Sequence, residues 1–120
     1  MQALEHNIEL FRGNTFSKKI SLTNKKTSAP IDISGWTFYF TIKKVRDMKN
    51  LTDDKAILKK IINVENGADG IIIFTLIPSE TSLISPTNYK YDITYKKTNG
   101  VVTTLIYGNF TVLPSVTRST

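Results

Sequence analysis

The chain has 120 residues, of which 40% are hydrophobic and 22% charged, with a formal net charge of +6 and no cysteine. A chain of this length is expected to form one domain that buries roughly two thirds of its unfolded surface. The lack of cysteine excludes disulfides, zinc–thiolate sites and cysteine nucleophiles. No run approaches the roughly 18 apolar residues that span a bilayer. The N-terminal MQALEH lacks the basic and apolar regions of a signal peptide, so we expect synthesis in a cytoplasm.

The positive charge is spread along the chain as lysine pairs. A basic protein can bind nucleic acid or an acidic surface, but no run of five or more like charges occurs here. Side chains alternate along a strand, so one lysine of a pair points outward and the other must lie at an edge or strand end. We therefore expect solvated lysines rather than a nucleic-acid patch. The pairs are Lys18-Lys19, Lys25-Lys26, Lys43-Lys44, Lys59-Lys60 and Lys96-Lys97.

The N-terminal half predicts strands separated by polar turns. A short apolar segment at 8–11 is broken by Arg12-Gly13-Asn14, and residues 15–23 form a strand that is followed by a polar loop at 24–30. Residues 36–42 give the clearest strand of this half. Its apolar face carries Trp36, Phe38, Phe40 and Ile42, and its other face carries Thr37, Tyr39, Thr41 and Lys43. A helix with period 3.6 would scatter the apolar set, so we expect it to form core.

The middle of the chain is less regular. Residues 47–55 predict a polar loop, and residues 56–64 fit either a strand or a helix. In the strand interpretation Leu58, Ile62 and Val64 share a face with Lys60. A turn is predicted at 66–70, a central strand at 71–76 and one helical turn at 78–83, where Pro78 and Glu80 favour a helix start.

The last third predicts a β-hairpin with one buried face. Tyr89, Tyr91, Ile93 and Tyr95 alternate with polar residues, Thr98-Asn99-Gly100 forms the turn, and a second strand covers 101–112. Tyr89 opens its strand after a short crossover, which is the place of a tyrosine corner in immunoglobulin-like sandwiches. The whole pattern predicts an all-β, antiparallel immunoglobulin-like β-sandwich of seven or eight short strands. Residues 1–120 would form this single domain, with 114–120 as a flexible tail.

The residues offer little chemistry. His6 is the only histidine, so neither a hydrolytic triad nor a histidine metal site can be built around it. Asp47, Asp53 and Asp54 lack the spacing of a calcium loop. We assign no catalytic, cofactor-binding or metal-binding residue and expect no enzyme. Tyr39 and Tyr107 are the two aromatic residues expected to be free for an exposed contact.

Several motifs occur in the order found in a known group of proteins. The chain resembles small domains of tailed bacteriophages and prophages, among them the N-terminal immunoglobulin-like module of baseplate upper proteins. It departs from their pattern at Asn14, where the family often has Asp, and at Asn88, where a glycine commonly precedes the tyrosine. The motifs are 12–16 (RGNTF), 30–36 (PIDISGW), 70–76 (GIIIFTL) with Thr81 and Leu83, 89–93 (YKYDI), 108–112 (GNFTV) and 116–118 (VTR).

The resemblance implies a structural role in a virion and transfers no catalytic residue. On this basis we expect a non-enzymatic structural or attachment component in a tail, baseplate or head decoration, located in the virion. Its partners would be other virion proteins or copies of itself, which dock on sheet edges and loops. We expect no specific nucleic acid, no membrane and no small-molecule substrate among its partners. A small carbohydrate- or surface-binding module is the alternative and needs an exposed aromatic platform. A nucleic-acid-binding barrel is the third hypothesis and needs a contiguous basic face.

Overall fold

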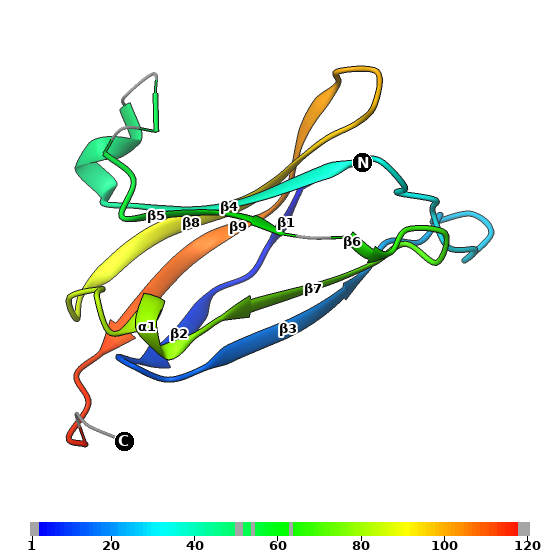
Figure 1. Ribbon diagram of the computed structural model, residues 1–120. Coiled ribbons are helices and arrows are strands. Elements are labelled where there is room, and N and C mark those ends of the chain that lie inside the picture. Colours follow the sequence, from blue (N-terminus) through cyan, green and yellow to red (C-terminus); the bar gives the residue numbers. More distant parts are fainter. Residues whose placement is uncertain (1–2, 50–51, 54, 63, 118–120) are drawn as a thin grey trace.

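The computed structural model describes residues 3–49, 52–53, 55–62 and 64–117, and within them two β-sheets face each other (Figure 1). The larger sheet has the order β1-β9-β8-β4-β5, with β2 also beside β9, and the smaller has the order β3-β7-β6. The predicted β-sandwich is confirmed. The larger sheet comprises β1 (Leu4–Glu5), β2 (Ile8–Phe11), β4 (Thr37–Lys43), β5 (Leu58–Ile62), β8 (Asn88–Lys96) and β9 (Val102–Leu113); the smaller comprises β3 (Phe16–Ser21), β6 (Val64–Asn66) and β7 (Ile71–Leu76). Of the predicted tail, residues 118–120 lie outside the described residues.

Phe40 lies at the centre of the core. Its ring centroid is 4.4 Å from that of Phe74, 5.7 Å from Tyr91 and 6.0 Å from Phe110. Phe74 belongs to the middle strand of the smaller sheet, whereas the other two rings come from β8 and β9 of the larger sheet. Phe40 therefore joins three adjacent strands of one sheet to the centre of the other.

The alternation predicted for residues 36–42 is confirmed, with one difference at its start. Phe38, Phe40 and Ile42 are fully buried. Trp36 is only half-buried; it lies at the end of the core, stacked on Tyr95 with ring centroids 4.9 Å apart. The Lys97 ammonium lies 5.2 Å from the Trp36 ring centroid and covers part of its outer side.

The N-terminal strands add a parallel edge to an otherwise antiparallel sheet. Both β1 and β2 pair with β9 in parallel and in one register, from Leu4 beside Ile106 to Phe11 beside Leu113. Between them the His6 carbonyl bends inward over Gly108, where an added Cβ would lie 2.3 Å from that oxygen. The Tyr91 hydroxyl donates a hydrogen bond to the same carbonyl. A glycine is therefore required at 108, and Tyr91 satisfies the displaced backbone group.

The ambiguous segment at 56–64 is a strand rather than a helix. Residues 58–62 form β5, the edge strand beside β4, and Leu58, Lys60 and Ile62 share its inner face as the strand interpretation requires. The chain then crosses to the smaller sheet, where β6 pairs with β7. The loop predicted at 47–55 differs, because a 3-10 helix, η1 (Val45–Lys49), occupies its beginning. The predicted helical turn is α1 (Pro78–Thr81).

The predicted tyrosine corner and lysine placement are both observed. The Tyr89 hydroxyl donates to the Ser85 carbonyl at 2.6 Å, in the turn that precedes its strand. Each lysine pair on a strand lies on an edge strand or a strand end: Lys18-Lys19 on β3, Lys59-Lys60 on β5, and the others at the ends of β4 and β8.

We expect Phe40→Ala to lower the free energy of unfolding by about 3–5 kcal/mol, because truncating a buried aromatic ring removes its contacts and leaves a cavity. Tyr39→Ala changes a neighbouring side chain on the outer face and should cost far less. Urea unfolding of the two variants checks this. Equal losses in the free energy of unfolding would contradict the assignment of Phe40 to the buried face of β4 and Tyr39 to the outer face.

Tyr89→Phe should lower the free energy of unfolding by about 0.5–1.5 kcal/mol, the net contribution of a typical hydrogen bond. The ring remains, so the change isolates the bond to the Ser85 carbonyl. Thermal and urea unfolding measure the loss. An unchanged stability would show that the corner bond contributes nothing to the fold.

Candidate functional site

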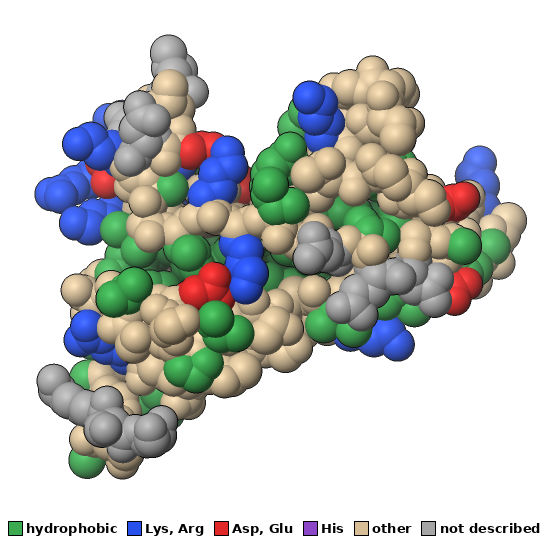
Figure 2. All heavy atoms as spheres, in the orientation of Figure 1, with side chains coloured by type: hydrophobic (Ala, Val, Ile, Leu, Met, Phe, Trp, Pro, Cys, Tyr) green, Lys and Arg blue, Asp and Glu red, His purple; other side chains and the backbone are tan. Residues whose placement is uncertain are grey.

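The outer face of the larger sheet carries a hollow of about 540 Å³ that is lined by charged, hydroxyl-bearing and aromatic side chains. Its floor is a row of side chains that are neighbours across five strands, and the β4–β5 loop supplies Met48 and Asp53 as one wall. Figure 2 shows the corresponding notch between the loop that carries η1 and the β8–β9 hairpin. We call this the sheet hollow. Its floor row is Lys59, Thr41, Asp92, Tyr107 and Glu5.

The two tyrosines predicted to be free for contact both line the sheet hollow, but they differ in access. Tyr107 is 43% exposed. Tyr39, beside Thr94 in the neighbouring row, has the Lys59 ammonium 5.4 Å from its ring centroid. One face of the Tyr39 ring is therefore occupied by a cation, and Tyr107 is the more accessible aromatic surface.

Asp53 fastens the loop wall to the sheet. Its carboxylate forms ion pairs with Lys43, at 2.8 Å, and with Lys59. Hydrogen bonds from Lys43 and then Lys59 hold the pKa of Asp53 below its usual value. Of the other acidic residues considered for calcium, Asp47 lies in η1, and Asp54 lies outside the described residues. Within the described part of the chain, no group of three potential metal-ligating side chains occurs.

Asp92 is a partly buried charged group of the sheet hollow. Its carboxylate accepts a long hydrogen bond from the Thr94 hydroxyl, at 3.3 Å. Burial is the largest effect on Asp92 and raises its pKa, and the negative charge of Asp53 raises the pKa further. The hydrogen bond from Thr94 and the positive charges of Lys43 and Lys59 lower the pKa, but they do not offset the rise. The folded protein thus holds this carboxylate at an energetic disadvantage. Sequence reasoning missed Asp92, although an acidic residue between Tyr91 and Ile93 in a strand is a visible signal.

A second surface, at one end of the sandwich, is apolar. Phe11 is 50% exposed, Leu83 80% and Val116 100%. Each is next in the chain to a residue, Arg12, Ser82 or Thr117, that lines a hollow of about 620 Å³. Arg12 Nε donates to the Ser82 carbonyl at 2.7 Å, and the Thr81 hydroxyl donates to the Asn14 carbonyl at 2.9 Å. We call the surface defined by Phe11, Leu83 and Val116 the apolar end.

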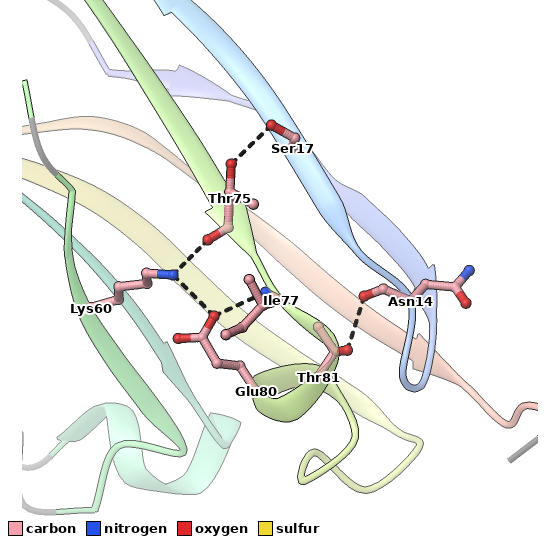
Figure 3. Close-up of polar contacts among 7 residues, drawn as sticks. All are labelled: Asn14, Ser17, Lys60, Thr75, Ile77, Glu80 and Thr81. Carbon is pink, nitrogen blue, oxygen red and sulfur yellow. Dashed lines mark hydrogen bonds and ion pairs between the residues drawn. The ribbon is translucent and has the colours of Figure 1, made fainter. Parts of the chain in front are cut away.

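The remaining charged pair near the interior, Lys60 and Glu80, has a structural role (Figure 3). Lys60 Nζ donates to the Thr75 carbonyl at 2.7 Å and to Glu80 Oε1 at 3.0 Å, so β5 is tied to β7 and α1. Glu80 Oε1 also accepts from the Ile77 N–H at 3.0 Å, which caps the start of α1. Burial alone would raise the pKa of Glu80, but these bonds outweigh it and hold the pKa below 4.5.

His6 is exposed, and its backbone rather than its imidazole makes the contacts described above. It lies between β1 and β2, beside the larger sheet. Within the described residues, no helix is long and apolar enough to cross a membrane.

Comparison with protein-family models and with curated proteins finds no match for this sequence. Among the solved structures that are similar in fold, three illustrate the range of proteins found. The N-terminal domain of phage TP901-1 ORF48 has a TM-score of 0.49 and 10% identity, covering 92% of this chain and 98% of that one. CopC from Methylosinus trichosporium OB3b has a TM-score of 0.50 and 10% identity, covering 92% and 87%. The fibronectin(III)-like modules of Clostridium thermocellum CbhA have a TM-score of 0.45 and 12% identity, covering 94% and 93%. The likeness to CopC agrees with a shared β-sandwich fold.

Glu80→Gln should lower the free energy of unfolding at neutral pH by roughly 0.5–1 kcal/mol, the range for a partly exposed ion pair. The pKa of Glu80 is lowered in the folded state, so the stabilisation is present above about pH 4.5 and is lost as the pH falls through the folded pKa. Urea unfolding from pH 7 to pH 3 should show the two proteins converging in acid. Glu9→Gln, at an exposed position of β2, is the control. A difference that is independent of pH would contradict the assigned role.

Proposed function

We propose that this protein is a non-enzymatic structural or attachment component of a bacteriophage or prophage particle, and that it acts through protein–protein assembly at the apolar end. The proposal rests mainly on one observation: three of the motifs that resemble phage domains, 12–16, the Thr81 and Leu83 pair, and 116–118, lie close together at that end. Motif 12–16 contacts the Thr81–Leu83 region through the bonds of Arg12 and Asn14, and Thr117 of motif 116–118 lines the same hollow.

The chemistry of the apolar end supports a protein partner. Large exposed apolar patches mark protein interaction sites. Phe11, Leu83 and Val116 are exposed, and each adjoins a residue that lines the same hollow. The lining of the hollow includes Pro86 and Pro114, which leave their loops little conformational freedom to lose on binding, and Pro78, the first residue of α1. The apolar end also adjoins the start of β3, an edge strand with unpaired backbone groups that a neighbour can use.

The distribution of lysines disfavours nucleic acid as the partner. The pairs lie on β3, on β5 and at the ends of β4 and β8, on different parts of the two sheets. Lys60 points inward to Glu80, and Lys43 and Lys59 are paired with Asp53. A groove that follows a phosphate backbone needs free cations in a continuous row.

We expect assembly that persists at high salt, because apolar contacts are not screened by ions. Light scattering at low and at about molar salt measures self-association, and co-expression with the products of phage capsid and tail genes tests a different virion partner. Leu83→Asp should abolish the association. Val102→Asp, at a similarly exposed apolar residue of β9 (61% against 80%), should leave it intact.

A strictly monomeric protein that binds none of these products and holds DNA at physiological salt would overturn the proposal. Loss of association in molar salt would also contradict it, because the interface would then depend on charge rather than on the apolar end.

A further inference from the structure

We infer that the sheet hollow is a binding site for a neutral oligosaccharide. This inference concerns a different face of the molecule from the apolar end and does not depend on the proposed assembly role. It rests on the charge balance of the sheet hollow, on the placement of Asp92 and on the exposure of Tyr107.

The lining of the sheet hollow has no net charge. It contains Lys43, Lys59 and Lys90 together with Glu5, Asp53 and Asp92. A site for phosphate, nucleic acid or another anion would expose a surplus of cations, and a site for a divalent cation would gather free carboxylates. Here Asp53 is already held by two lysines. The lining therefore offers both donors and acceptors and has no net charge, which suits a ligand rich in hydroxyl groups.

Asp92 supplies the acceptor. It lies in the middle of the floor row, between Thr41 of β4 and Tyr107 of β9. A carboxylate that accepts from a sugar hydroxyl makes a charge-assisted hydrogen bond, which is stronger than a neutral one. Asp92 is partly buried, and the hydrogen bond that it accepts from the Thr94 hydroxyl is long, at 3.3 Å. A hydroxyl-bearing ligand would provide the missing donors.

Tyr107 supplies the apolar contact. Sugar rings have an apolar face of C–H groups that packs on aromatic rings, and Tyr presents a large rigid ring with a polar tip. Tyr107 is opposite Asp92 on the adjacent strand, so one sugar unit can contact the ring and the carboxylate together. The volume of about 540 Å³ lies within the range of roughly 300–1,000 Å³ that is typical of ligand sites.

The test is binding of the whole protein to an array of neutral and acidic oligosaccharides, with and without about 0.5 M NaCl. We expect binding to neutral glycans that is insensitive to salt. For the tightest neutral glycan, amide chemical shifts should change on β4, β8 and β9 around Thr41, Asp92 and Tyr107.

Asp92→Asn and Tyr107→Ser should each weaken binding of that glycan about tenfold or more, equivalent to about 1.4 kcal/mol. Asp92→Asn keeps the shape and removes a poorly solvated charge, so its unfolding midpoint should not fall. Ile73→Ser is the matched control: Ile73 is 39% exposed on the outer face of the other sheet, against 43% for Tyr107. It should bind within about twofold of the unchanged protein.

Three results would overturn the inference: no glycan bound, binding confined to acidic glycans and lost in salt, or neutral-glycan binding that survives both variants. Leu83→Asp separates the two proposals, because it should abolish assembly and leave glycan binding unchanged.

Discussion

The packing of Phe40 against Phe74 is the contact on which the rest of the structure depends. It joins the two sheets at ring centroids 4.4 Å apart, and Tyr91 and Phe110 pack around it from the neighbouring strands. Because these aromatic rings fill the interior, the inner faces of β4 and β8 are committed to stability. Successive side chains of a strand point to opposite faces, so the residues that alternate with the buried ones on β4 and β8 point outward. The outer face of the larger sheet is thereby free to carry polar groups.

The two outer surfaces have opposite chemistry. The sheet hollow has equal numbers of acidic and basic side chains and is built on paired strands, whereas the apolar end is built from loops and the end of β2 and exposes Phe11, Leu83 and Val116. A polar floor on paired strands suits a small ligand that is oriented by hydrogen bonds. An apolar patch on proline-containing loops suits a larger protein surface. One fold can therefore hold a neighbour at its end and leave a sheet face open to solvent.

Much of the fold could be predicted from local patterns. The alternation around Phe38 and Tyr91, the turn at 98–100 and the corner at Tyr89 are properties of adjacent residues. The parallel pairing of β1 and β2 with β9 could not be predicted, because it joins distant parts of the chain, such as Leu4 and Ile106, and no local pattern specifies it. The sequence predicts part of the sheet hollow, because the alternation of the strands places Tyr39 and Tyr107 on the outer face. The position of Asp92 among Lys43, Lys59 and Asp53 follows only from the pairing of β4 with β5 and β8.

The most direct test of the central claim, that assembly and ligand binding use separate surfaces, is an experimental structure of the protein in its assembled form, soaked with the neutral glycan that binds it. The account predicts a protein neighbour on Leu83 and Val116, and sugar density beside Tyr107 and Asp92. A neighbouring protein seated across Tyr107 and Asp92, with the apolar end left in solvent, would contradict it.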